Sequence, residues 1–208
     1  MSFPHKNRPE NCTSCLMAVK QNGTLLEHIL EQTDEICLAA VKENSSALQY
    51  VKQQTYEICL AAVMHYRSAL EYVKEQSLDQ GQYMEICRVA VQNNGDALQY
   101  VSENKLGDTQ YIEICFEAVK NSCNALQFIK QQTFDLCLIA VRNDGDSLRY
   151  VNEQIFTSGQ YYEICLAAMI NGCSLLYVNE KNLTAEQYYS ICQSALHINS
   201  MYNKSIHL

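Results

Sequence analysis

The stretch that decides the fold covers residues 33–54 and reads TDEICLAAVKENSSALQYVKQQ. It returns from Thr55 as TYEICLAAVMHYRSALEYVKEQ and from Thr133 as TFDLCLIAVRNDGDSLRYVNEQ. Further copies carry six additional residues and are 28 residues long. A period between 20 and 50 residues is typical of solenoids, in which each unit buries its apolar side against the next one.

Each copy predicts two helices that are separated by a turn. Apolar side chains of the first helix recur at i, i+3, i+4, i+7 and i+8, which is one face of a 3.6-residue period. A shorter helix with apolar residues at i and i+3 follows at once. The residues that we expect in the core are therefore Ile36, Cys37, Ala40, Val41, Ile86, Cys87, Ala90, Val91, Leu98 and Val101.

The turn within each copy carries the signals of a helix end and of a helix start. Ser46 and Gln49 predict a capping box for the second helix. Ser45, Arg67 and Cys123 stand where other copies have glycine, which predicts strain of about 1 kcal/mol at each. The glycines that predict a left-handed cap on the first helix are Gly23, Gly95, Gly145 and Gly172.

These patterns together predict an all-α fold, an α-solenoid of about eight helix-turn-helix repeats of 22 or 28 residues. The units begin near residues 13, 33, 55, 79, 108, 133, 157 and 184. We expect one helical-repeat domain over 13–199, a flexible N-terminal arm over 1–12 and a C-terminal tail over 200–208. A period of 22 could also indicate one long supercoiled helix, but the glycines within each unit and the two repeat lengths argue against it.

The composition of the 208 residues excludes several classes of protein. With 7 Gly, 2 Pro and no Trp, the chain does not resemble a turn-rich β-protein. Its 48% of hydrophobic residues and 18% of charged ones argue against disorder. The longest apolar run, residues 164–170, is too short to cross a bilayer. Because the first residues lack the apolar core of a secretory signal, we expect a cytoplasmic protein without membrane contact.

The cysteines point to a repeat position and not to a disulfide framework. Successive units place their thiols about 10 Å apart, too far for a shared zinc ion or a disulfide. We therefore expect reduced, buried thiols and predict no metal site and no cofactor. Cys12 and Cys15 form a lone C-x-x-C, which is a weak signal for metal or redox chemistry. The periodic cysteines are Cys15, Cys37, Cys59, Cys87, Cys115, Cys137, Cys165 and Cys192.

Aromatic residues also recur once per unit, and we name this row the tyrosine ladder. Such rings could stack on nucleic-acid bases or pack half-buried beside the second helix. The net charge of −8 argues against phosphate binding. The five histidines show no ligand spacing and there is no phosphate-binding loop, so we predict no catalytic residue and no enzyme. The tyrosine ladder comprises Tyr50, Tyr72, Tyr100, Phe128, Tyr150 and Tyr177.

Three segments carry a resemblance to a known family. They are Ala40-Val41, residues 47–51 (ALQYV) and residues 94–101 (NGDALQYV). The unit resembles an uncharacterised ALQYV-type helical repeat, a domain of unknown function that is abundant in amoeba-infecting giant viruses and occurs in amoeba-associated bacteria. The resemblance implies no activity, cofactor or catalytic residue. It implies a viral protein in the host cytoplasm or the virion, which acts on host or viral proteins.

The function that we expect is a non-enzymatic scaffold or adaptor for protein–protein interaction. The two positions after the periodic cysteine vary in polarity while the apolar stripe does not, so they are candidates for partner choice, although they could also fill gaps between layers. The alternatives are a nucleic-acid-binding helical repeat and a cysteine-based metal or redox protein. The sequence leaves the partner and the oligomeric state open. The candidate partner-binding residues are Leu38, Ala39, Leu60, Ala61, Arg88, Val89, Phe116, Glu117, Leu138 and Ile139.

Overall fold

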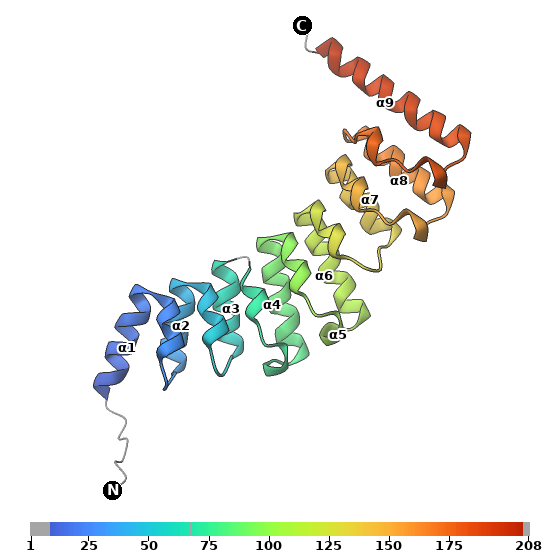
Figure 1. Ribbon diagram of the computed structural model, residues 1–208. Helices are drawn as coiled ribbons and strands as arrows, with labels where there is room; N and C mark the ends of the chain where they lie inside the picture. Colours follow the sequence, from blue (N-terminus) through green and yellow to red (C-terminus); the bar gives the residue numbers. More distant parts are fainter. Residues whose placement is uncertain (1–8, 67, 206–208) are drawn as a thin grey trace. The chain divides into compact units, whose positions relative to one another are not determined.

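A computed structural model describes residues 9–66 and 68–205 of the chain, and the side chains of residues 13–66 and 68–196. In this part of the chain α-helices alternate with short 3₁₀-helices, and no strand occurs (Figure 1). The prediction of an all-α fold built from helical hairpins is confirmed. None of the described helices combines the length and the apolar character that a membrane span needs.

The contacts divide the chain into two compact units. One contains Met1–Asn93 and Tyr100–Tyr111, and the other contains Asn94–Gln99 and Ile112–Leu208. The single domain over 13–199 therefore stays a prediction. Residues 1–8 of the predicted arm and 206–208 of the predicted tail lie outside the described residues, while residues 9–12 and 200–205 are helical.

In the first unit, α1 to α4 lie side by side in chain order, and each is followed by a short 3₁₀-helix (Figure 1). This is the stack of hairpins that a solenoid requires. Its elements are α1 (Pro9–Gln21), η1 (Gly23–His28), α2 (Asp34–Glu43), η2 (Ser45–Tyr50), α3 (Tyr56–His65), η3 (Ala69–Tyr72), η4 (Glu75–Ser77), α4 (Gln80–Asn93) and α5 (Glu103–Leu106).

In the second unit α7, α8 and α9 lie side by side (Figure 1). Two elements, η5 (Gly95–Tyr100) and α6 (Asp108–Asn121), contain residues of both units. The remaining elements are η6 (Cys123–Phe128), α7 (Phe134–Asn143), η7 (Gly145–Tyr150), η8 (Glu153–Ile155), α8 (Ser158–Ile170), η9 (Leu175–Tyr177), η10 (Glu180–Asn182) and α9 (Ala185–Ser205).

The apolar stripe of the first helices forms the core. Ile36, Cys37, Ala40 and Val41 on α2 are each at most 3% exposed, and their counterparts on α4 are fully buried. Leu98 is 2% exposed. Val101 is the exception, because it stays partly exposed. The four-residue helix α5 follows it directly, and Leu106 of that helix is the buried apolar side chain there instead.

The second element of each hairpin is a 3₁₀-helix, and its cap differs from the predicted one. Asn44 precedes η2, and its Oδ1 accepts a hydrogen bond from the Ser46 backbone N–H at 3.0 Å. The Gln49 amide does not reach back to the cap but donates to the Ser46 carbonyl oxygen at 3.0 Å. The predicted Ser46/Gln49 capping box is therefore wrong, because an Asx turn at Asn44, two residues before Ser46, already satisfies the Ser46 N–H.

Capping boxes start the first helices of two longer units. Thr157 and Gln160 exchange hydrogen bonds at the start of α8. Asp79 and Gln82 do the same before α4, at 2.8 and 3.2 Å. These reciprocal bonds satisfy two backbone donors at each helix start.

Glycine in the turn has a packing role in three of the four predicted positions. Gly23, Gly95 and Gly145 do not have a positive φ, so the predicted left-handed cap is wrong there. A Cβ on Gly95 would overlap the carbonyl oxygen of Ala118, and one on Gly23 would overlap that of Ala40. The missing side chain thus allows the turn to approach the next first helix closely.

Only Gly172 has the predicted left-handed conformation, with φ +84°. The Cys173 N–H donates to the Ala168 carbonyl at 3.1 Å and the Gly172 N–H to that of Met169 at 3.1 Å, which is a Schellman motif. No described non-glycine residue has a positive φ, so the strain predicted at Ser45 and Cys123 is absent. Arg67 lies outside the described residues.

Candidate functional site

The candidate partner-binding residues lie on the first helices, and each is partly exposed. In the first unit they belong to α2, α3 and α4, and in the second unit to α6 and α7. Each stands next to the buried stripe of its own helix, so rigid packing fixes its position. We name these ten residues the first-helix surface; they are Leu38, Ala39, Leu60, Ala61, Arg88, Val89, Phe116, Glu117, Leu138 and Ile139.

The first-helix surface changes in character along the chain. Leu38, Ala39, Leu60 and Ala61 give α2 and α3 an apolar outer side. On α4 the surface becomes charged, because Arg88 pairs with Glu85 at 3.2 Å. This variation on a constant core is what a surface that discriminates between partners needs.

The periodic cysteines from Cys37 to Cys165 are buried, whereas Cys15 and Cys192 are partly exposed. Burial raises the pKa of Cys59 and Cys137 to about 12. The thiols therefore stay protonated at neutral pH and are poor nucleophiles and poor metal ligands. No group of three His, Cys, Asp or Glu side chains that could hold a metal ion occurs in the described part of the chain. The side chain of Cys12 lies outside it.

A buried glutamine joins neighbouring hairpins, and sequence reasoning missed it. Gln54 is 5% exposed, and its Nε2 donates to the carbonyl oxygens of Leu48 and Tyr72 at 3.0 and 2.8 Å. Its Oε1 accepts from the Lys74 N–H at 2.7 Å and from the Cys59 thiol at 3.5 Å. One side chain thus bonds backbone groups of two successive 3₁₀-helices, and a periodic cysteine donates to it.

The same contacts recur at the equivalent glutamines. Gln32 bonds the carbonyls of Leu26 and Tyr50, at 3.3 and 3.0 Å, and accepts from the Lys52 N–H at 3.0 Å. In the second unit Gln132 repeats the arrangement between η6 and η7, at 2.7 to 3.2 Å. The sequence signal was a glutamine five residues before the periodic cysteine in each of these units.

Tyrosine replaces this glutamine in the longer units. The Tyr83 hydroxyl accepts from the Ser102 N–H at 2.8 Å, and the Tyr161 hydroxyl accepts from the Asn179 N–H at 3.0 Å. Burial raises the pKa of both phenols, and it raises the pKa of Cys87 to about 12. In the longer units a tyrosine hydroxyl of the first helix therefore accepts the backbone N–H that a glutamine oxygen accepts in the shorter units. We name the glutamines that bond backbone groups of two successive hairpins the bridging residues: Gln32, Gln54 and Gln132.

The rings of the tyrosine ladder are partly exposed. In the second unit the guanidinium carbon of Arg149 lies 4.9 Å from the Tyr150 ring centre and 5.7 Å from the Tyr177 ring centre. Hydrogen bonds to the Tyr177 and Tyr150 hydroxyls raise the pKa of Arg149. One cation thus contacts the rings of two successive hairpins, which is a favourable cation–π geometry.

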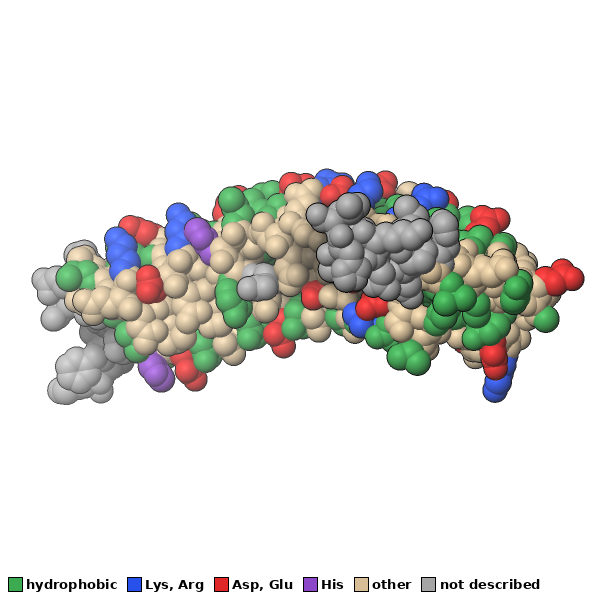
Figure 2. Space-filling view, turned by 90° about the horizontal axis from the view of Figure 1, so that it is seen from above, with side chains coloured by type: hydrophobic (Ala, Val, Ile, Leu, Met, Phe, Trp, Pro, Cys, Tyr) green, Lys and Arg blue, Asp and Glu red, His purple; other side chains and the backbone are tan. Residues whose placement is uncertain are grey.

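The lysines beside the ladder do not form a basic track. The Lys52 ammonium donates to the Leu30 carbonyl at 2.6 Å, and that of Lys74 donates to the Val51 carbonyl at 2.8 Å. Lys105 likewise bonds the Leu78 carbonyl at 2.7 Å. Figure 2 shows Lys and Arg side chains interspersed with Asp and Glu on the visible face. A surface that binds phosphates would instead present clustered cations.

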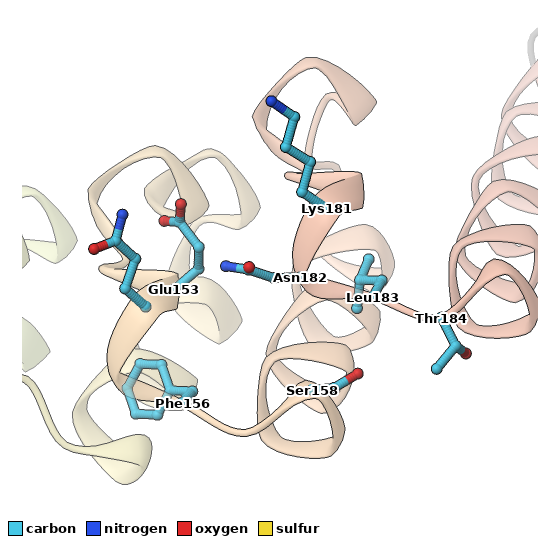
Figure 3. A pocket seen from close by; sticks show the side chains of 8 residues that line it. Glu153, Phe156, Ser158, Lys181, Asn182, Leu183 and Thr184 are labelled. Carbon is cyan, nitrogen blue, oxygen red and sulfur yellow. The ribbon is translucent and has the colours of Figure 1, made fainter.

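A shallow, polar groove of about 340 Å³ lies between η8 and η10 in the second unit (Figure 3). Its Ser158 hydroxyl donates to Gln187 Oε1 at 2.6 Å, and its Glu153 carboxylate accepts from Asn179 Nδ2 at 2.9 Å. No histidine is among the residues that line the groove. The lining residues are Glu153, Gln154, Phe156, Ser158, Lys181, Asn182, Leu183 and Thr184.

Fold and surfaces define the class as an all-α helical-repeat protein. The model of a family described as "Domain of unknown function (DUF4116)" matches residues 33–77 and 111–156. Each matched segment spans two hairpins, from α2 to η4 and from the middle of α6 to η8. Two segments of the chain are therefore similar to this domain of unknown function. No curated protein and no solved structure matches the chain.

Proposed function

We propose that the protein is a non-enzymatic scaffold that binds another protein through the first-helix surface. The observation that carries the proposal is the position of ten partly exposed side chains of varied polarity beside a uniform, buried stripe. Fixed backbones with variable outer residues lower the cost of ordering a binding surface. Half-exposed aliphatic and aromatic side chains are typical of interface centres.

We also propose a biological setting from the ALQYV-type repeat. The protein is viral in origin, it works in the host cytoplasm or the virion, and its partner is a host or viral protein. The hydrogen bonds of the bridging residues and the protonated thiols support a structural role for these polar groups, in preference to metal or redox work.

Capture from an amoeba lysate with quantitative mass spectrometry tests the proposal. The double variant Ala39→Glu with Ala61→Glu places charge on α2 and α3, and it should lose the specific partner at least tenfold. The matched control, Gln53→Glu with Gln76→Glu, adds two charges at exposed linker positions and should keep it.

Two results would overturn the proposal. One is an identical set of captured proteins for both double variants. The other is tight, strongly salt-dependent retention of RNA on a filter, which would favour the nucleic-acid-binding alternative.

A further inference from the structure

The side chain of Arg149 contacts two rings of the tyrosine ladder. Its guanidinium contacts the rings of Tyr150 and Tyr177, at 4.9 and 5.7 Å. The two tyrosines belong to η7 and η9, which are neighbours in successive hairpins. One guanidinium can therefore contact two successive rings of the ladder at the same time.

The first unit repeats the rings without the arginine. Tyr50 and Tyr72 are partly exposed and belong to η2 and η3, which are also neighbours. The residues that precede them are Gln49 and Glu71. The Gln49 amide points back to its own helix, where it bonds the Ser46 carbonyl at 3.0 Å.

The charge around these rings favours a cationic occupant. The described side chains of the first unit, residues 13–66, 68–93 and 100–111, include twelve acidic and six basic residues. Glu71 stands beside Tyr72 and is exposed. The ammonium groups of Lys52 and Lys74 donate to backbone carbonyls. A guanidinium from outside would find two ring faces and a carboxylate together.

We propose that Tyr50, Tyr72 and Tyr100 bind an extended, arginine-rich segment of a partner protein, with one guanidinium between each pair of successive rings. This proposal rests on the proposed protein-binding function and assigns it a second surface. Neighbouring helical layers are about 10 Å apart. A polyproline II segment advances about 3.1 Å per residue and has three residues per turn, so arginines three residues apart lie on one side of it and match the rings.

Fluorescence anisotropy with a labelled peptide, RSSRSSRSS, tests the spacing and the side chain. A peptide with lysine in place of arginine keeps the charge but should bind at least fivefold more weakly, because it loses the planar stacking. RSRSRSSSS keeps three arginines at a spacing of two and should also bind at least fivefold more weakly. Equal affinity for the three peptides would overturn the proposal.

Substitutions in the protein locate the site. Tyr72 stands between Tyr50 and Tyr100 in the order of the ladder, so Tyr72→Leu should weaken binding of RSSRSSRSS about tenfold. Tyr189→Leu is the matched control, because this tyrosine of α9 is 65% exposed and lies outside the ladder. Circular dichroism verifies that each variant is folded, and Tyr50→Leu provides a second test. Unchanged affinity in both ladder variants would overturn the proposal.

Arg149→Gln supplies an independent gain-of-binding test. The substitution removes the guanidinium from the rings of Tyr150 and Tyr177. Titration calorimetry should therefore find more RSSRSSRSS bound per protein molecule than in the wild type. Unchanged stoichiometry would contradict the inference. If no peptide binds while Ala39→Glu with Ala61→Glu still loses a captured protein, this inference fails and the proposed function stands. If neither effect occurs, both fail.

Discussion

Replacing Gln54 tests how neighbouring hairpins are held together. This buried side chain bonds the carbonyls of Leu48 and Tyr72 and the N–H of Lys74. Gln54→Leu keeps a similar volume but removes these bonds. The Leu48 carbonyl retains a bond from the Val51 N–H at 3.1 Å, so two backbone groups lose their partner.

An unsatisfied buried polar group costs about 1–3 kcal/mol. Tyr72 and Lys74 are partly exposed, so water recovers some of this loss. We expect Gln54→Leu to lower the free energy of unfolding by about 2–4 kcal/mol. The leucine introduced at position 54 is stabilised by hydrophobic burial, which offsets part of the loss, and the range of about 2–4 kcal/mol includes this offset.

Urea unfolding followed by circular dichroism measures the effect. Gln53→Leu is the matched control, because Gln53 is the exposed neighbour and makes none of these bonds. The control should unfold within about 0.5 kcal/mol of the wild type. Equal midpoints for Gln54→Leu and Gln53→Leu would refute the reasoning that Gln54 joins the hairpins.

Three further predictions concern the glycines, a buried hydroxyl and the thiols. Gly95→Ala should lower the free energy of unfolding by about 1–3 kcal/mol, because the added Cβ would overlap the next helix. Gly159→Ala should raise it by about 0.5–1 kcal/mol, because nothing lies within 4 Å of its Cβ position. Thermal unfolding that ranks the two variants in the opposite order would contradict the close-packing role of Gly95. Ser147→Ala should raise the free energy of unfolding, measured with urea, by about 1 kcal/mol, because the buried Oγ has no hydrogen-bond partner among the described residues. A urea midpoint below that of the wild type would show that the hydroxyl does have a partner. Burial raises the pKa of Cys59 to about 12, above the value near 8.5 of an unfolded thiol, so its stabilising contribution is complete below pH about 8.5 and is lost as the pH rises toward 12. The urea midpoint should therefore fall less between pH 8 and 10.5 in Cys59→Ala than in the wild type. An equal fall of the midpoint in the variant and in the wild type would disprove this.

The core could be predicted from the sequence because a helical stripe is a local pattern. Ile86, Cys87, Ala90 and Val91 follow the 3.6-residue period and are fully buried. The period alone fixes which face turns inward. Nearly the whole hydrophobic core of the hairpin stack follows from that rule, with Val101 as the exception.

The turns were harder to predict, because more than one local structure fits the same residues. Asn-Gly is typical both of a left-handed helix cap and of an Asx turn that starts a 3₁₀-helix. Gly172 adopts the first conformation, whereas Gly95 is required by a neighbour that is distant in sequence. Sequence periodicity does not predict how closely a turn approaches a helix of the neighbouring hairpin.

The bridging residues could not be predicted from their chemistry alone. A glutamine at a repeat end, such as Gln54, is usually a solvated side chain. Its role depends on backbone groups of two hairpins that only the folded stack brings together. Tyr83 accepts the Ser102 N–H from another sequence position, which hides its equivalence to the bond between Gln54 and the Lys74 N–H. The partly exposed positions of the first-helix surface, in contrast, follow directly from their place beside the stripe.

Amide hydrogen exchange at Lys74 and Asn152 tests the central claim, that bridging residues join successive hairpins, most directly. Both N–H groups donate to a glutamine side chain in place of a backbone carbonyl, at 2.7 and 2.8 Å. We predict exchange at least about 100-fold slower than in an unstructured chain. In Gln54→Leu the Lys74 amide alone should lose this protection, while Asn152 keeps it. Exchange of both amides at unprotected rates in the wild type would contradict the account.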